Sequence, residues 1–469
     1  MPFTSALDLS AAIRRREISP VEALDDHLAE VDRLNPQLNA IVFRDDERAR
    51  VDAQHAGELI AHSDVDDLPP FCGVPIPIKD LADVAGWPTS HGSRATAPGP
   101  VDDDALQVAR LRSAGFVLMG KTAAPEFGSI SCTESERFGA TRNPWDLDRT
   151  PGGSSGGAAA AVAAGMAPIA HASDGGGSIR IPASCTGLVG LKPSRNRITG
   201  LVEELHGACT DGVVTRTVAD TAAVLDCLAD DDLGAWNSAL RSAGTYLEAA
   251  ATEPQPLRVL VCNDNAIGIP PDPAVVAAVD EATTLLESLG HHVEVGVPTW
   301  PDAGEFLTAF LMVWSTMSAT VPIVDEELLE PHNRADRDHA RNTDALSYLR
   351  ALAQLQLASR EFTAAFGRDF DVLVSPTMAV LPPVVGSVWN GIEADPMAPV
   401  LNSTPMACYT AVYNVTGQPA LSLPLHVDDS GLPVGVQFAA GPWQDQLLLS
   451  LGAQLEAAAP WSGRTPPPT

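Results

Sequence analysis

Basic residues are scarce in this chain. Its 469 residues include 29 Lys and Arg against 60 Asp and Glu, which gives a formal net charge of -31 at pH 7. Nucleic-acid phosphates are held by clustered Lys and Arg, so this balance argues against a nucleic-acid partner. The simplest explanation for the charge is the solvated acidic surface of a globular protein.

Paired cysteines and long apolar runs are also missing. The seven cysteines are scattered, odd in number and without C-x-x-C spacing, which favours reduced thiols over a disulfide framework. No apolar run follows the first residues, so no secretory signal is visible. The most apolar stretch, residues 158–172, is interrupted by Gly165 and Pro168 and is too short to span a bilayer. These absences predict a soluble, cytoplasmic protein without a membrane partner.

Metal-binding motifs are the third absence. The eleven histidines include no H-E-x-x-H pair, and we expect neither a metal nor a cofactor. His171 precedes Asp174 by three residues, which suggests the base of a Ser-His-Asp triad. We interpret His171 as a structural histidine instead.

Two glycine-rich loops carry the most informative serines. The first reads PGGSSGG at residues 151–157 and the second DGGGSIR at residues 174–180, so Ser154 and Ser178 are 24 residues apart. Glycine lets backbone N–H groups crowd against a reacting atom, and a serine among them can have both a hydroxyl and an oxyanion site. Lys79 ends the apolar segment VPIPIK, whose prolines disfavour helix and indicate an extended, strand-like element. Together these residues predict the nucleophile region of a hydrolase.

The motifs resemble the amidase signature family, whose members use a Ser–cis-Ser–Lys triad. The resemblance includes both glycine loops and the segments GVPIPIKD (73–80), FGATRNPW (138–145) and GLVGLKP (187–193), and it continues more weakly at residues 215–220, 371–377 and 414–420. It implies that Ser178 is the acylated nucleophile, Ser154 the bridging serine on a cis peptide and Lys79 the base. It also implies an oxyanion hole made by the backbone N–H groups of Gly175, Gly176, Gly177 and Ser178.

A lysine base must be neutral to accept a proton. The reference pKa near 10.4 leaves about one lysine in a thousand or fewer neutral at pH 7. Burial and hydrogen bonding must therefore lower the pKa of Lys79, and the apolar strand end offers such an environment. Ser154 would then relay protons between Ser178 and Lys79.

The resemblance implies hydrolysis of a small carboxylic amide, to an acid plus an amine or ammonia, through an acyl-enzyme on Ser178. Most family members carry Thr where this chain has Gly175, and the form DGGGS is most similar to amidases of the nylon-oligomer cyclic-dimer hydrolase type.

Two alternatives remain open. One is the A subunit of a glutamine-dependent tRNA amidotransferase. The other is an α/β-hydrolase-type esterase with Ser155 in a G-x-S-x-G elbow, although the polar residues 146–151 do not look like the strand that this motif requires.

Interleaved helical and strand patterns predict an α/β fold, and the resemblance implies a large mixed sheet between helical layers. Residues 5–35 carry two helical patterns, the second opening with the capping box of Ser19 and Glu22. Residues 257–262, 273–289 and 292–295 read as a β-α-β unit, and further strands are predicted at 371–375, 421–425 and 433–438. We expect a single amidase domain over residues 1–469, with the signature core at about 70–220.

The divergent segment at about residues 230–360 is predicted to shape the substrate pocket. Phe306, Phe310, Trp314 and Met317 recur there at helical spacing, so they share one helix face. This stripe is either ordinary core or a pocket wall, and Trp314 in a wall would favour aryl or aliphatic amides. Gly128, Ser129 and Ile130 match a substrate-contacting segment of the family. A small-molecule amide is the expected partner, and a homodimer is left open.

Overall fold

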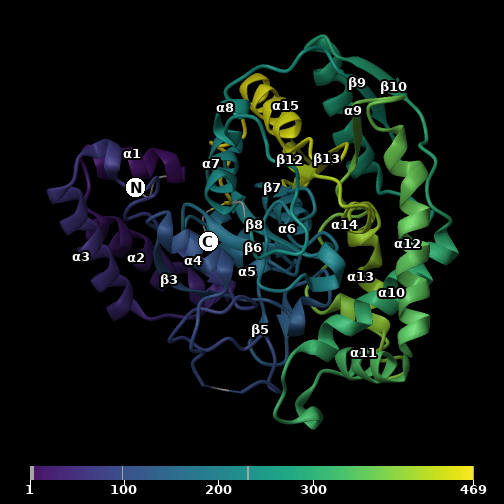
Figure 1. Cartoon of the computed structure of the whole chain (residues 1–469), viewed down its shortest axis with the longest axis horizontal. Coiled ribbons are helices and arrows are strands. Elements are labelled where there is room, and N and C mark those ends of the chain that lie inside the picture. Colours follow the sequence, from purple (N-terminus) through teal and green to yellow (C-terminus); the bar gives the residue numbers. More distant parts are fainter. Residues whose placement is uncertain (1–4, 98, 230–231, 468–469) are drawn as a thin grey trace.

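An eight-stranded mixed sheet runs through the computed structural model, which describes residues 5–97, 99–229 and 232–467 (Figure 1). Three neighbouring strands are parallel and the other pairings are antiparallel. The spatial order is β10 (His292–Val295), β9 (Arg258–Val261), β11 (Val372–Pro376), β13 (Pro433–Ala440), β12 (Ala420–Val427), β7 (Val189–Lys192), β8 (Thr210–Thr215) and β6 (Ala170–Asp174). The predicted β-α-β unit is confirmed, because α9 (Pro273–Ser288) joins β9 to the parallel strand β10.

Helices cover both faces of this sheet. Alternate residues of β11 face opposite ways, so Val372 and Val374 join one apolar cluster and Leu373 joins another. The first face packs against α7 (Val218–Leu228), α9 and α15 (Asp445–Ala458); the second packs against α5 (Gly156–Ala163), α6 (Arg180–Thr186) and α14 (Ala411–Thr416). The predicted α/β fold, with a large mixed sheet between helical layers, is confirmed.

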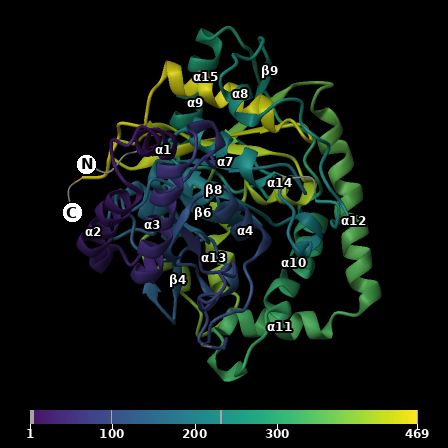
Figure 2. The ribbon, with the colours of Figure 1, turned by 60° about the vertical axis from the view of Figure 1, so that its left-hand side comes forward.

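A smaller sheet brings Lys79 to the edge of the large one. Its order is β1 (Ile41–Phe43), β3 (Val117–Thr122) and β2 (Pro75–Lys79), and β2 lies beside the edge strand β6. The helices α1 (Ala6–Arg14), α2 (Pro20–Leu38) and α3 (Asp46–His62) lie on this side of the molecule (purple in Figures 1 and 2). Ser19 caps α2 with the predicted capping box.

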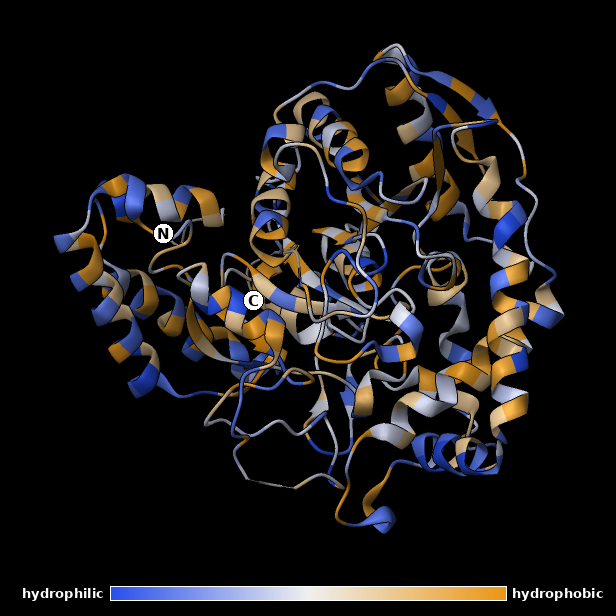
Figure 3. Ribbon diagram, in the orientation of Figure 1, coloured by the Kyte–Doolittle hydropathy of each residue, from blue (hydrophilic) through white to orange (hydrophobic). Residues whose placement is uncertain are grey.

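The later part of the divergent segment forms a helical layer on the opposite side (green in Figure 1), made of α10 (Ala303–Thr320), α11 (Pro331–Asn342) and α12 (Ala345–Ala365). Figure 3 shows α11 as mostly hydrophilic, whereas α10 and α12 carry apolar residues that pack in a common cluster. Within the described ranges, none of the helices combines the length and the apolar composition needed to cross a bilayer.

Candidate active site

Lys79 is the last residue of β2, in which every residue is buried. Its Nζ atom lies 2.8 Å from Ser154 Oγ and 3.0 Å from Ser173 Oγ. Burial lowers the pKa of Lys79 to about 7, because desolvation of the ammonium group outweighs the attraction of carboxylates such as Asp211 and Asp174. Near neutral pH a large share of this side chain is therefore an uncharged amine that can accept a proton.

Ser154 lies in the first glycine loop, two residues before the start of α5, and the Gly153–Ser154 peptide bond is cis. The next residue joins the two loops, since the N–H group of Ser155 donates to the carbonyl oxygen of Ser178 at 3.3 Å. Gly128 closes the other side: it has φ +71°, and a Cβ there would lie 3.1 Å from Ser154 Oγ. Ser154 is thus enclosed between Lys79, Gly128 and the second loop.

Ser178 lies in the second loop, which connects the edge strand β6 to α6. Its residue surface is 8% exposed, and its hydroxyl has no hydrogen-bond partner among the described residues. The backbone N–H groups of Gly175, Gly176 and Ser178 likewise donate to no protein group in the described ranges. Free donors beside a reachable hydroxyl are the arrangement that an oxyanion intermediate needs.

Gly177 differs from the other glycines of this loop. Its N–H group donates to Asp174 Oδ1 at 2.7 Å, so it is not a free oxyanion donor in this structure. The Asp174 carboxylate also accepts from the N–H group of Ile179, so it binds two backbone N–H groups of this loop. The N–H groups of this loop that have no protein acceptor in the described ranges are therefore those of Gly175, Gly176 and Ser178, and the oxyanion hole itself stays a prediction.

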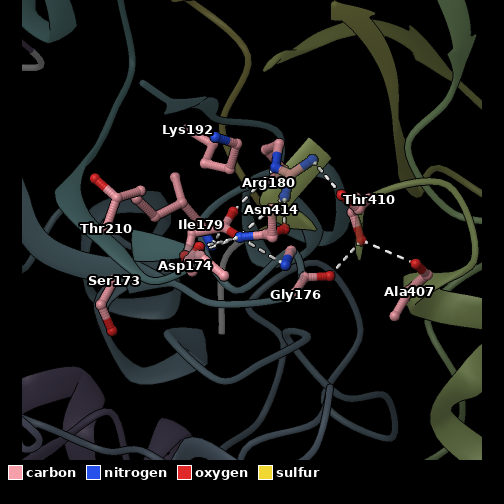
Figure 4. Close-up of polar contacts among 12 residues, drawn as sticks. Ser173, Asp174, Gly176, Ile179, Arg180, Lys192, Thr210, Ala407, Thr410 and Asn414 are labelled. Carbon is pink, nitrogen blue, oxygen red and sulfur yellow. Dashed lines mark hydrogen bonds and ion pairs between the residues drawn. The ribbon is translucent and has the colours of Figure 1, made fainter. Parts of the chain in front are cut away.

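Asp174 and Arg180 form a fully buried ion pair beside the nucleophile loop (Figure 4). Arg180 donates to both carboxylate oxygens of Asp174 at 2.9 Å, and Asn414 Nδ2 donates to Oδ1 at the same distance. Burial alone would raise the pKa of Asp174, but these donors hold it well below its ordinary value. Arg180 also donates to Gln437 Oε1, at 2.9 Å, and this contact anchors the nucleophile loop to β13.

Trp314 lies on α10 and packs against the nucleophile loop. A Cβ built on Gly175 would lie 3.4 Å from the indole carbon Cζ3, and one built on Gly176 would lie 3.6 Å from it. The same Cβ on Gly175 would lie 2.7 Å from Cys209 Sγ. The structure therefore explains why glycine replaces the threonine of most family members: Cys209 and Trp314 occupy the space of that side chain.

The rest of the aromatic stripe continues away from this loop. The ring centroids of Phe310 and Trp314 are 5.4 Å apart, and those of Phe306 and Phe310 are 6.4 Å apart. Phe306 is buried in the apolar cluster under α10 and α12. The stripe therefore packs in the core at Phe306 and against the nucleophile loop at Trp314.

Two of the three candidates at residues 128–130 have partners other than Ser154. Ser129 Oγ is hydrogen-bonded to the carbonyl of Glu126 and to His332 Nε2, both at 3.0 Å. Ile130 packs in a small apolar cluster with Cys132 and Val388. Of the three, Gly128 is the one placed beside Ser154, and substrate contact by this segment stays a prediction.

The competing triad and elbow interpretations do not match the geometry. His171 Nδ1 accepts from the backbone N–H of Lys79 at 3.4 Å, and Nε2 is hydrogen-bonded to Asp211 at 3.0 Å, so this ring supports β2. Ser155 Oγ is fully buried and donates to the carbonyl of Ser173 at 3.1 Å. No strand leads into Ser154, because residues 150–152 are irregular and Gly153 forms a bend, whereas a nucleophile elbow follows a strand.

Sequence reasoning missed Ser173 and Thr410. Ser173 is a further partner of the Lys79 amine, and Thr410 donates to the carbonyl of Gly176 at 2.6 Å. Ser173 directly precedes the glycine motif, so its position was a usable signal. Thr410 is more than 230 residues from its partner and lies outside every motif considered. No group of three or more His, Cys, Asp or Glu side chains that could hold a metal occurs among the described residues.

Comparisons with known proteins agree with this site. The family model described as Amidase matches residues 22–449. The chain is 35% identical to the 6-aminohexanoate-cyclic-dimer hydrolase of Paenarthrobacter ureafaciens, over 97% of this chain and 94% of that protein. It is 34% identical to an acylamidase of Rhodococcus erythropolis, over 99% and 97% of the two chains.

Solved structures give the same result. A 6-aminohexanoate cyclic dimer hydrolase complexed with substrate has a TM-score of 0.91, 33% identity and 98% coverage of both chains. A bacterial aryl acylamidase has a TM-score of 0.88, 27% identity and 98% coverage of both. A glutamyl-tRNA(Gln) amidotransferase chain from Thermotoga maritima has a TM-score of 0.75 and 27% identity, with 95% of this chain and 94% of that chain covered.

The chain belongs to the amidase family, and it is an enzyme that hydrolyses amide bonds. Neither the amidotransferase alternative nor the Ser155 esterase is favoured, since the two relatives matched over nearly the whole chain are named as a cyclic-dimer hydrolase and an acylamidase, and Ser155 is buried with its hydroxyl bonded to Ser173.

Proposed function

We propose that this enzyme cleaves its amide through an acyl-enzyme on Ser178, with Ser154 and Lys79 as the proton relay. The observation that carries the proposal is the 2.8 Å hydrogen bond between Lys79 Nζ and Ser154 Oγ, in a buried setting beside the Ser178 loop. A low pKa of the lysine and a neighbouring hydroxyl are what a base-activated serine requires.

In the first half of the reaction, the neutral Lys79 amine accepts the Ser154 hydroxyl proton while Ser154 accepts the proton of Ser178. Ser178 Oγ then forms a bond to the amide carbon, and the carbonyl electron pair moves onto oxygen. The N–H groups of Gly175, Gly176 and Ser178 would stabilise that oxyanion. When the C–N bond breaks, the relay returns a proton to the departing amine.

In the second half, water attacks the ester on Ser178. The same relay removes a proton from the water as its oxygen bonds to the acyl carbon, and the Ser178 oxygen takes up a proton as the ester bond breaks. The products are a carboxylic acid and the regenerated enzyme, so no external oxidant, reductant or co-reactant is needed.

For the substrate class, we propose an apolar amide, aryl or aliphatic and linear or cyclic. The support is the Trp314 indole against Gly175 and Gly176, in the divergent segment that we propose shapes the pocket. Relatives named as a cyclic-dimer hydrolase and an aryl acylamidase are consistent with it. A cytoplasmic location fits the seven free cysteines, since reduced thiols persist in a reducing compartment.

The pH dependence of kcat/KM tests the role of Lys79. Because burial lowers the pKa of Lys79 to about 7 and the neutral form is the base, kcat/KM should rise with pH through about 7 and level off above about pH 8. The measurement is a profile from about pH 5.5 to about pH 9.5 with an anilide substrate. A rate that falls across this range would contradict the proposal.

The role of Trp314 can be tested with a substitution on the same helix as a control. We expect Trp314→Ala to raise KM for aryl and aliphatic amides about 10-fold, because an apolar wall is lost, while a fluorophosphonate probe still labels Ser178. Leu307→Ala, on a more exposed part of α10, should leave KM unchanged. Unchanged kinetics in Trp314→Ala would remove this residue from the pocket, and loss of folding would assign it to the core.

A substrate screen tests the proposed substrate class, apolar amides, directly. Release of amine or ammonia should be faster from anilides and medium-chain aliphatic amides than from glutamine or acetamide. Faster turnover of glutamine would instead favour the amidotransferase-like alternative.

A further inference from the structure

The peptide unit between Gly176 and Gly177 is held at both ends. At one end, Thr410 Oγ1 lies 2.6 Å from the carbonyl oxygen of Gly176 and 3.1 Å from that of Ala407; the hydroxyl has one proton, and the shorter contact assigns it to Gly176. At the other end, the Gly177 N–H donates to Asp174 Oδ1 at 2.7 Å. Because a peptide unit is planar, two such bonds fix the orientation of the whole plane.

These two hydrogen bonds, which we call the clamp, matter because residues 175–177 are all glycine. Glycine populates more backbone conformations than any other residue, so the segment 175–177 has little stiffness of its own. The Gly176–Gly177 plane lies between the two peptide units that carry the N–H groups of Gly176 and Ser178. Holding that plane therefore limits the directions in which these two free donors point.

Thr410 is itself fixed in place. It lies in the turn between α13 (Ala398–Ala407) and α14, it is fully buried, and its carbonyl accepts from Arg180 Nη1 at 2.9 Å. A Cβ on Gly177 would lie 2.3 Å from Thr410 Oγ1, so glycine is required at position 177 for the hydroxyl to come this close. Through Arg180, Thr410 is connected to Asp174, which makes the other contact of the clamp.

We propose that Thr410 is a positioning residue for the oxyanion donors of this enzyme. Its hydroxyl holds the Gly176–Gly177 plane so that the N–H groups of Gly176 and Ser178 point at the developing oxyanion before substrate arrives. Donors that are preorganised cost no reorganisation during the reaction, which is why misplacing them slows chemistry. The proposal rests on the acyl-enzyme mechanism at Ser178.

The test compares Thr410→Val with Thr410→Ser. Valine keeps the shape of threonine without the hydroxyl, and we expect kcat for an anilide to fall about 10- to 100-fold while KM changes less than about twofold. The rate of fluorophosphonate labelling at Ser178 should fall by a similar factor, because the tetrahedral adduct uses the same donors. Serine restores the hydroxyl, so Thr410→Ser should regain most of kcat.

Thr404→Val is the matched control. Thr404 lies on α13, and its hydroxyl donates to the carbonyl of Val400 in the same helix at 3.1 Å. This variant should retain parental kcat. The melting temperatures of all three variants separate a local effect from unfolding.

A folded Thr410→Val variant with parental kcat and labelling rate would overturn the proposal. So would an equal loss in Thr410→Ser, since it would point to packing rather than to the hydroxyl. Failure of the mechanism itself has a different signature: Ser178→Ala would then still be labelled by the probe and would still turn over substrate.

Discussion

Replacing Ser178 with alanine is expected to lower kcat by roughly 10⁴- to 10⁶-fold, because the nucleophile acts as a unit with its base and its loss removes covalent catalysis altogether. The Ser178 hydroxyl has no hydrogen-bond partner among the described residues and its residue is 8% exposed, so its removal should leave the folded structure intact. The measurement is turnover of an anilide together with probe labelling and peptide mass mapping. Labelling should disappear from the peptide that contains residue 178.

Ser155→Ala provides the comparison for this experiment. Ser155 stands in the neighbouring glycine loop, but its hydroxyl is committed to the carbonyl of Ser173. Probe labelling at Ser178 should persist in this variant. Covalent label on Ser155 in the parent protein would contradict the assignment of the nucleophile and favour the elbow.

Replacing Lys79 with methionine is expected to lower kcat about 10²- to 10⁴-fold, the range typical of a lost general acid–base group. Methionine has similar length and no charge, so it fills the site without accepting a proton. The pH profile is the more specific readout, because the rise through about pH 7 should disappear along with the amine. A variant that keeps both its rate and the rise would exclude Lys79 as the base.

The stability of Lys79→Met separates lost chemistry from lost folding. The pKa of Lys79 is lowered by burial from 10.5 to about 7, so folding at low pH requires an ammonium group to be buried. This cost is fully present below about pH 7 and disappears as pH rises toward 10.5. Relative to the parent, the variant should therefore be most stabilised at low pH, and denaturant unfolding at about pH 6 and about pH 9 checks the sign.

Much of the architecture follows from local sequence pattern. The capping box at Ser19 and the β-α-β unit at residues 257–295 depend on caps and periodicity within short windows, and both are present. The extended segment ending at Lys79 depends on its prolines, which disfavour helix in any context. The glycine motifs likewise predicted which residues form the loops of the site.

Residues that depend on long-range contacts were not predictable in this way. The α10 stripe predicts a shared helix face, but helical spacing does not say what that face meets, and Trp314 meets Gly175 from a distant part of the chain. The same holds for Ser129, whose hydroxyl turns to His332 because α11 packs over that loop.

The sequence by itself determined which reactive groups are present and which elements surround them. These groups are two serines among glycines and a lysine at the end of an apolar strand. The tertiary structure decided the pKa of the lysine and the hydrogen-bond partners of the loop. Packing β2 beside β6 buries Lys79 against Ser173, and the resulting desolvation lowers the pKa of the amine. Asp174 takes the Gly177 N–H, and Thr410 reaches Gly176 from a distant segment. Burial and hydrogen-bond direction depend on what surrounds a residue in space, and no local pattern encodes them.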